Sequence, residues 1–311
     1  MPALLILLAA VCFGTTGTAL ALGPDSASPA SAGAVRIVVG GALLAMVVFA
    51  RRSSRRGAPP RAAARLRVPT VVLVLVGAAA IVAYQPTFFL GTTRAGVAVG
   101  TIVALGSAPI FTGLLEWVAT RRFPGTVWIV ATVVASVGVA LLGGALEPGS
   151  SRVDPVGIAG SLGAGASYAV YALVAKLLLM RGAHSTWSMG ALFGSAAAVS
   201  LPIALTTDLS WLARPDGVAT AVWLGVVTTG VAYVLFGRGL SDVRASTAAT
   251  LTLVEPLTAA LLGVLILGET LAATAASGIA VVAAGLLVLV VPRRGGAPRR
   301  SERVTSRADG F

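Results

Sequence analysis

The sequence predicts an all-α polytopic membrane protein with ten transmembrane helices, arranged as two inverted five-helix repeats. Of its 311 residues, 57% are apolar and only 11% are charged, and apolar runs recur along the whole length. A run of about 20 residues, at ~1.5 Å of rise per residue, matches the ~30 Å hydrocarbon core of a bilayer. Runs of this length also exclude a transmembrane β-barrel, whose strands need only about ten residues.

Ten apolar segments account for these runs. Helices are expected at residues 3–22, 32–50, 69–90, 96–119, 126–145, 156–179, 187–205, 218–237, 246–267 and 271–291. The first segment could be a signal peptide, because Ala19-Leu20-Ala21 resembles a cleavage site. We expect it to be retained, since no Lys or Arg precedes it and its removal would leave the first half one helix short.

The two halves share a pattern that indicates a duplication. A shift of 147 residues places Pro109 on Pro256, and in each half a polar break follows, at Arg121-Arg122 and Gly268-Glu269. Five helices per half give the halves opposite orientations in the membrane, which is the architecture of alternating-access carriers. The expected units are residues 1–150 and 151–292, each one repeat, and a disordered basic cytoplasmic tail at 293–311.

Basic residues indicate the orientation, because Lys and Arg are retained on the cytoplasmic side. With both termini in the cytoplasm, the clusters Arg51–Arg67 and Arg293–Arg307 are cytoplasmic, and the first is expected to lie on anionic lipid as a topology anchor. They account for most of the net charge of +12, so nucleic acid is not an expected partner. Four basic residues remain on or near the outer side: Arg36, Arg94, Arg152 and Arg214. The expected location is the inner or plasma membrane.

One carboxylate, Glu255, falls near the predicted membrane midplane, directly before Pro256. A charge at this depth costs about 2.5 kcal/mol or more, so it has to face the bundle interior or a water-filled cavity. Glu255 is therefore the first candidate for binding a cationic group or a proton, and a hydrogen-bonded carboxylate that fixes a proline kink is the alternative. No intramembrane arginine is expected beside it, because the other charges lie close to helix ends.

Further polar and aromatic side chains could line the same cavity. Tyr84-Gln85 combines a stacking face with an amide, as small-molecule pockets do. The other candidates are Thr15, Tyr168 and Tyr233, each of which could equally serve helix packing. Arg36 is expected to snorkel to the outer interface, with a contact to substrate or a gate as the alternative.

Two acidic residues near helix ends have expected structural roles. Glu116 is expected to pair with Arg121 or Arg122 at the end of its helix. Glu269 is expected to stabilise the N-terminus of the tenth helix through the helix dipole. Inverted insertion places Arg122 and Glu269 on opposite faces, about 30 Å apart.

Several short motifs carry a resemblance to a known family. They are Glu255-Pro256, the LGETL sequence of residues 267–271 with Gly278 and Gly285, and the stretches Phe13–Thr16, Ser28–Ala30 and Ser167–Ala169. Together they resemble the EamA-type branch of the drug/metabolite transporter superfamily, ten-helix inner-membrane carriers with duplicated halves. The first half departs from the pattern, because Ala108 and Arg122 stand at the positions that match Glu255 and Glu269. A symmetric glutamate pair therefore cannot operate here.

The resemblance implies a secondary carrier that exports a small organic metabolite or drug, with import as the alternative. No GxxxxGK[ST] loop is present, so proton coupling or facilitated diffusion remains. A channel is disfavoured because no filter or charge ring recurs. An intramembrane enzyme is disfavoured because no HExxH motif is present and Cys12 has no base nearby in the sequence. No catalytic residue, metal or cofactor is expected; the expected partners are a small-molecule substrate and the lipid bilayer, and a homodimer stays open.

Overall fold

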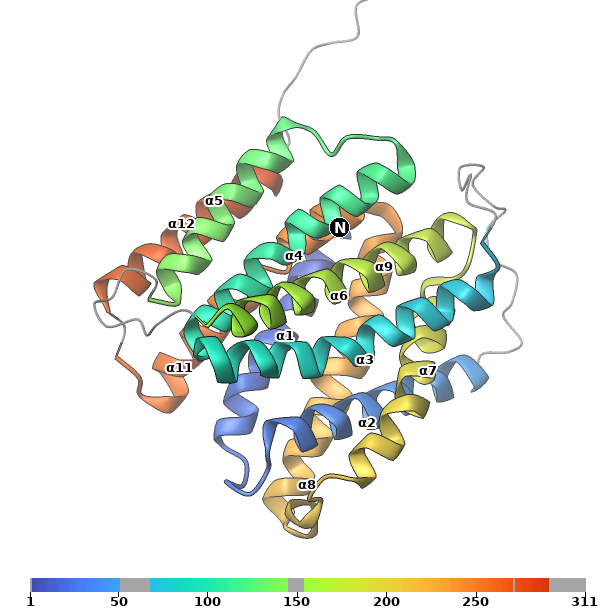
Figure 1. The fold of residues 1–311 in the computed structure, drawn as a ribbon, viewed down its shortest axis with the longest axis vertical. Helices are drawn as coiled ribbons and strands as arrows, with labels where there is room; N and C mark the ends of the chain where they lie inside the picture. The colour runs from blue at the N-terminus through green and yellow to red at the C-terminus, as the bar shows by residue number, and fades with distance from the viewer. Residues whose placement is uncertain (1, 51–67, 145–153, 271, 291–311) are drawn as a thin grey trace, which may run out of the picture.

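The computed structural model describes residues 2–50, 68–144, 154–270 and 272–290, which form helices and no strand. The first half contains α1 (Pro2–Ala21), α2 (Pro29–Ala50), α3 (Thr70–Ala95), α4 (Val97–Thr120) and α5 (Thr126–Leu142). The second half contains α6 (Pro155–Met180), α7 (Ser185–Leu205), η2 (Ser210–Ala213), α8 (Pro215–Val222), η3 (Trp223–Val231), α9 (Ala232–Asp242), α10 (Ala245–Leu251), α11 (Val254–Leu267) and α12 (Ala273–Val290). Figure 1 shows their arrangement.

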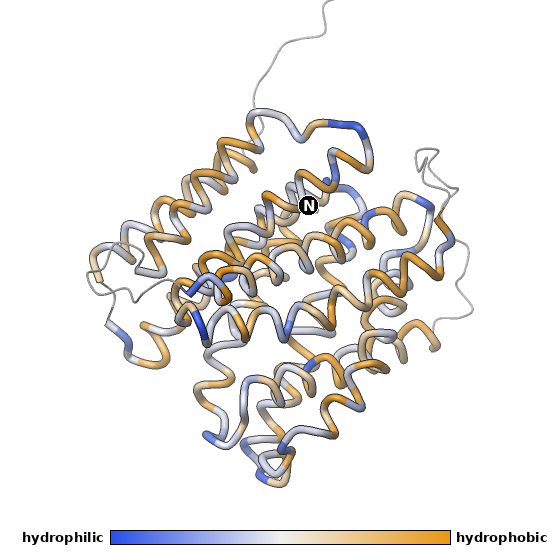
Figure 2. The backbone as a smooth tube through the Cα atoms, in the orientation of Figure 1, coloured by the Kyte–Doolittle hydropathy of each residue, from blue (hydrophilic) through white to orange (hydrophobic). Residues whose placement is uncertain are grey.

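The predicted fold class is confirmed. In the described part of the chain nine helical segments are long and apolar enough to cross a membrane, and α5, with 17 residues, is a shorter apolar helix at the fifth expected position. Two of the crossings are composite: α8, η3 and α9 run end to end, and so do α10 and α11. Apolar residues dominate the helices, and hydrophilic ones concentrate in the turns (Figure 2). The cluster at 51–67 and the tail from 291 lie outside the described residues.

The helices pack in a pattern that persists when the two halves are exchanged. α1 packs against α11 as α6 packs against α4, and α3 packs against α6 as α1 packs against α9 and η3. The remaining large contacts, α2 with α7 and α5 with α12, each join equivalent helices of the two halves. This pairing is consistent with an inverted repeat related by a twofold axis.

The α5/α12 pair fixes the relative position of the two interhelical turns. Gly138 of α5 faces Val282 and Gly285 of α12 faces Ala135, in each case so closely that a Cβ on the glycine would collide with the partner's backbone nitrogen. The two helices are therefore antiparallel (Figure 1). The turn before α5, at Arg121–Gly125, and the residues that follow α11, Gly268–Thr270, consequently lie at opposite ends of the pair.

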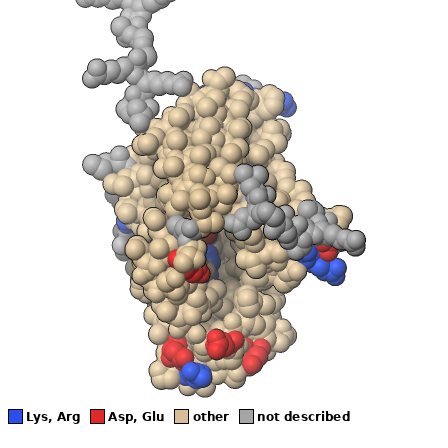
Figure 3. Space-filling view, turned by 90° about the vertical axis from the view of Figure 1, so that its left-hand side faces the viewer, with Lys and Arg blue, Asp and Glu red and all other residues tan. Residues whose placement is uncertain are grey.

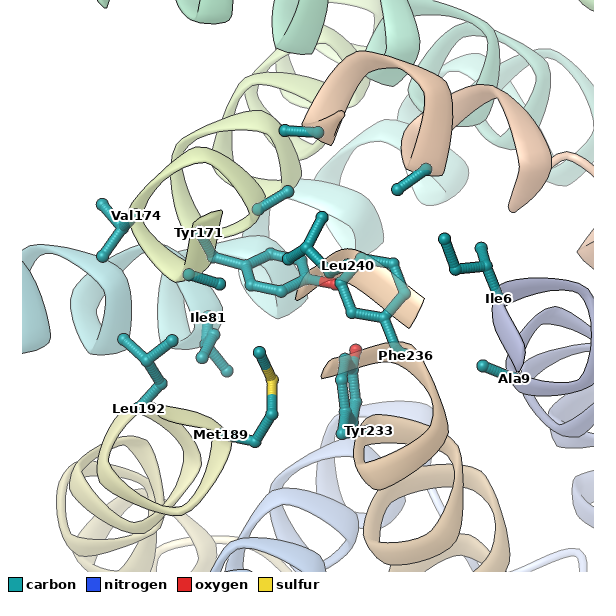
Figure 4. Packing of buried hydrophobic residues seen from close by; sticks show 14 of the residues in the cluster. Ile6, Ala9, Ile81, Tyr171, Val174, Met189, Leu192, Tyr233, Phe236 and Leu240 are labelled. Carbon is teal, nitrogen blue, oxygen red and sulfur yellow. The ribbon is translucent and has the colours of Figure 1, made fainter. Parts of the chain in front are cut away.

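The interior of the bundle is a cluster of apolar and aromatic side chains. In Figure 4, side chains from three helices share the space between them: Ile6 of α1, Met189 and Leu192 of α7, and Phe236 and Leu240 of α9. Both halves contribute to this cluster, which gives the two repeats one continuous core.

Glu116 does not pair with Arg121 or Arg122, so that expectation is wrong. Its side chain is 5% exposed, and its carboxylate accepts hydrogen bonds from the backbone N–H groups of Ala245 and Ser246, both at 3.1 Å, and from the Ser246 hydroxyl. The first N–H groups of a helix lack partners within the helix, and a carboxylate is a strong acceptor for them. Glu116 of the first half therefore caps the ninth crossing, in the second half.

Other contacts join the halves at the same end of the bundle. The Trp128 indole N–H donates to the Ser246 carbonyl at 3.1 Å, and Arg244 Nη1 donates to the carbonyls of Phe123 and Pro124 at 3.1 and 3.2 Å. The start of α10 is thus held by α4, by α5 and by the turn between them.

Glu269 also differs from its expected role. α12 begins at Ala273 and has no acidic residue in its first turn. Instead, the Glu269 backbone N–H donates to the Gly263 carbonyl at 3.1 Å, beyond Gly268, whose φ of 69° ends α11. Glu269 therefore belongs to the C-terminal cap of α11, because its backbone bonds that helix and α12 begins four residues later.

Replacing Glu116 with Leu should destabilise the protein, because it leaves buried donors of Ala245 and Ser246 without an acceptor, at about 1–3 kcal/mol for each. Glu116→Gln keeps one acceptor oxygen and should lose less. Thermal unfolding in detergent measures both, with Glu269→Leu, at an exposed residue, as the control. An unfolding temperature for Glu116→Leu equal to that of the control would contradict this capping role.

Candidate functional site

A cavity in the middle of the bundle is bounded by both halves. About 820 Å³ of space there is not filled by atoms, a figure that includes the part open to solvent. Its wall is built from α1, α2, α3, α4, α6, α7, η3, α9 and the junction between α10 and α11. The space-filling view shows the molecule hollowed near the middle of one face, with acidic and basic atoms in and beside the hollow (Figure 3).

Six of the seven candidate residues come together in this wall: Arg36, Tyr84, Gln85, Tyr168, Tyr233 and Glu255. Thr15 is the exception. Its hydroxyl accepts a hydrogen bond from the Trp223 indole at 3.0 Å and donates to the Cys12 carbonyl at 2.8 Å. Thr15 thus ties α1 to η3, whereas Phe13, two residues earlier on α1, lines the cavity.

Glu255 lies at a break in the ninth crossing. α10 ends at Leu251 and α11 begins at Val254. The backbone N–H of Glu255, the second residue of α11, donates to the carbonyl of Thr252, three residues back, at 2.9 Å. Pro256 is thereby in the first turn of α11, where its missing N–H leaves no hydrogen bond unmade. The carboxylate is at the positive end of a helix dipole, which stabilises a negative charge by about 0.3–1 kcal/mol at exposed sites and more in partly buried geometries.

Arg36 corrects two expectations. It lines the cavity instead of snorkelling outward, and Glu255 therefore shares its site with an arginine. The physical reason is that α2 begins at Pro29, so Arg36 is seven residues, or roughly 10 Å, inside the helix. Among the described residues, ion pairs within 4.0 Å are confined to Arg94–Asp154 and Arg214–Asp216, so Arg36 and Glu255 do not touch directly.

Aromatic side chains form much of the remaining wall. The Tyr233 ring is 4.9 Å from that of Phe13 and 3.9 Å from that of Phe193, measured between centroids. Tyr171 lies edge-on to Tyr168 with centroids 5.1 Å apart, and Figure 4 shows Tyr171 and Tyr233 approaching each other. The cavity therefore combines one acid and one base with rings that can pack on an apolar or cationic group.

The cavity is symmetric in position and asymmetric in chemistry. Ala108 of α4 and Glu255 are related by the 147-residue shift, and both line the wall; so do Leu105 and Thr252. The first half supplies apolar side chains where the second supplies a carboxylate and a hydroxyl. The Tyr168 hydroxyl and Thr252 Oγ1 lie 3.1 Å apart in a hydrogen bond that joins α6 to the helix break.

Thr229 and Phe193 also line the cavity and were not predicted from the sequence. Thr229 lies in η3, a π-helical segment, where each turn contains about one more residue than an α-turn. A period of 3.6 residues therefore does not predict which face Thr229 occupies. The adjacent hydroxyls of Thr228-Thr229 in an apolar segment are the signal that could have indicated it.

The described residues form no group of three or more His, Cys, Asp or Glu side chains suited to a metal ion. Outside the crossings, the pKa of Asp208 is lowered because the Ser210 backbone N–H donates to its carboxylate at 2.8 Å. This turn supports the start of α2, because the Ser31 hydroxyl donates a hydrogen bond to the Asp208 carbonyl.

Comparison with known proteins gives the following relatives. A family model described as the EamA-like transporter family matches residues 1–144 and 155–291. The chain is 38% identical over 292 residues to the transporter YwfM of Bacillus subtilis (strain 168), covering 94% of each chain. It is 31% identical over 199 residues to the threonine/homoserine exporter RhtA of Escherichia coli (strain K12), covering 60% of this chain and 64% of that protein.

One solved structure, described only as a protein, shares the fold. It aligns with a TM-score of 0.75 and 18% identity, over 93% of this chain and 96% of that one. The repeat boundary expected between residues 150 and 151 falls in the gap between the two family matches and outside the described residues, and it stays a prediction.

Replacing Gly14 with Ala should displace Glu255, because a Cβ at Gly14 would lie 2.5 Å from Thr258 Cβ and 2.7 Å from the Glu255 carbonyl oxygen. We expect a lower unfolding temperature in detergent. Gly17→Ala, one turn further along α1, is the matched control, since a Cβ there meets nothing within 4 Å. It should leave stability unchanged or raise it, by up to about 1 kcal/mol from helix propensity. Equal effects of the two substitutions would refute the close packing of α1 on α11.

Proposed function

The chain belongs to the EamA-like transporter family and is a multi-pass membrane transporter, and from this premise we propose that it is a secondary carrier that exports a zwitterionic amino acid by alternating access. The observation that carries the proposal is the presence of one base, Arg36, and one acid, Glu255, in the same cavity without a direct ion pair.

The separation of the two charges suits a solute that carries both signs. A carboxylate can bind the Arg36 guanidinium, which presents a planar fork of N–H donors. An ammonium group can bind the Glu255 carboxylate and the faces of neighbouring aromatic rings. The relative RhtA is named a threonine/homoserine exporter, which supports an amino acid as the substrate and export as the direction.

Hydrogen bonds between the halves at one end of the bundle support alternating access. Glu116, Trp128 and Arg244 hold the two halves together at one end, while the cavity wall is bounded by both halves. In a carrier built from inverted repeats, exchange of the two halves' conformations closes one end and opens the other. Substrate would then leave on the opposite side of the membrane.

Glu255 is the group we propose for proton coupling. A carboxylate can bind either a proton or the ammonium group of the substrate, whereas arginine stays charged. Binding of an outside proton to Glu255 would release the ammonium group, so proton entry would drive substrate exit. This exchange needs no nucleotide, in keeping with the missing GxxxxGK[ST] loop.

Counterflow in proteoliposomes tests the function. Vesicles are preloaded with each of the twenty amino acids in turn, and entry of the same labelled amino acid is followed. A carrier shows acceleration by the internal solute, at least for one amino acid. Flux without acceleration would indicate a channel, and flux no greater than in empty liposomes for all twenty would refute the proposed substrate class.

In the same assay, Glu255→Gln should flatten the pH dependence of transport between about pH 5.5 and 8.5, since the amide cannot exchange a proton. Proton-driven net flux should fall by about tenfold or more, the size expected for losing a charged hydrogen bond. Glu269→Gln changes an exposed carboxylate that does not line the cavity, and it should keep the normal profile. A normal rate and pH profile for Glu255→Gln would reduce Glu255 to a structural residue.

We also propose that both termini are cytoplasmic, in the inner or plasma membrane, because basic residues then gather on the cytoplasmic side. In a Cys12→Ala background, a cysteine at the exposed Ser26 should react with an impermeant thiol reagent applied to intact cells. A cysteine at the exposed Arg122 should not react until the cells are permeabilised. The reverse labelling pattern would invert the orientation.

A further inference from the structure

The π-helical segment η3 brings an additional residue to one carbonyl. The hydroxyls of Thr228 and Thr229 both donate to the Leu224 carbonyl, at 2.7 and 3.0 Å, from four and five residues further along the chain. An α-helical turn presents the residue at i+4, and the wider π-turn also presents the one at i+5. Such segments are rare and occur frequently at functional sites.

The π-turn directs Thr229 toward α2. Its side chain is buried, with 1% of the residue exposed, and its hydroxyl oxygen accepts a hydrogen bond from Arg36 Nε at 3.2 Å. A Cβ at Gly40, one turn after Arg36, would collide with the Thr229 side chain, so α2 and η3 approach closely at this point. Because the Thr229 hydroxyl hydrogen is committed to Leu224, the oxygen is left to accept from Arg36.

The contact determines which part of the guanidinium remains for a ligand. Arginine has five N–H donors, one on Nε and four on the two terminal nitrogens. Thr229 engages Nε, and Tyr233, which also interacts with Arg36, can accept at most two more hydrogen bonds through its hydroxyl. The terminal nitrogens therefore retain donors for the cavity, which Arg36 lines.

We propose that Thr229 is a positioning residue that holds the Arg36 guanidinium so that its terminal fork receives the carboxylate of the substrate. Thr229 also keeps Arg36 apart from Glu255. A guanidinium released from Nε could turn toward that carboxylate, and an internal ion pair would then compete with both charges of a zwitterion. The proposal rests on the proposed function, because it assigns a role within the same site.

The test compares Thr229→Val, which keeps the shape and removes the hydroxyl, with Thr229→Ser, which restores it. Thr228→Val is the matched control, since Thr228 bonds the same carbonyl but is not part of the cavity wall. Counterflow is measured with the amino acid that the wild-type protein transports fastest and with its carboxamide, which lacks the negative charge.

Thr229→Val should raise KM for the amino acid by about 10- to 100-fold, the range expected for a charged hydrogen bond, with little change in Vmax or in the KM for the carboxamide. Thr229→Ser and Thr228→Val should behave as wild type. A loss in Thr229→Val that is equal for acid and amide, or equal to that in Thr228→Val, would overturn the proposal and leave only helix packing.

A second measurement does not depend on the substrate. In protein labelled with ¹⁵N-arginine and held in detergent micelles, the Arg36 Nε–H signal is identified by its loss in Arg36→Lys. It should be protected from exchange in the wild type, Thr229→Ser and Thr228→Val, and exposed in Thr229→Val. An unchanged signal in Thr229→Val would overturn the contact even if amino acid transport is found, whereas absent transport with a changed signal would refute the proposed function alone.

Discussion

Two opposite charges inside a membrane-spanning bundle are the constraint on which the rest of this structure depends. A charged side chain near the membrane centre is costly unless it faces a polar or watery space. The chain meets this constraint by placing Arg36 and Glu255 in one cavity and building that cavity from both halves. Nearly all the other surfaces of the crossings can then be apolar, as Figure 2 shows for most of the helices.

The departures from regular helix occur where these charges need support. The ninth crossing breaks at Thr252-Leu253, which puts Glu255 at the start of α11, and the eighth contains η3, which puts Thr229 beside Arg36. Irregular backbone at membrane depth is tolerated where it lines a cavity or is buried in protein. Both irregular crossings belong to the second half. In the first half α4 continues through Pro109, and Ala108 takes the place of Glu255, so a symmetric scaffold carries an asymmetric site.

The hydrogen bonds that join the halves at one end have a separate physical basis. The N–H groups at the start of α10 have no partners within the helix, and Glu116 of the other half supplies a buried acceptor. Opening this end requires these hydrogen bonds and those of Trp128 and Arg244 to be exchanged for water. If the protein works by the alternating access proposed above, the hydrogen bonds that stabilise the fold at this end are also the ones that its transport cycle breaks.

The sequence by itself determined the fold class and the helices of the described residues within a few residues of their ends, because apolar length is a local property. It also predicted six residues that do line the cavity, since aromatic and polar side chains deep in apolar helices have few other places to go. Only the tertiary structure decided that Arg36 shares a cavity with Glu255, that Arg36 bonds Thr229, that Thr15 bonds Trp223 and that Glu116 caps α10. Each of these relations joins residues more than a hundred positions apart. They depend on where a helix begins, how it is rotated and which neighbour it meets, and a π-turn or an early helix start changes that rotation without changing the apolar pattern.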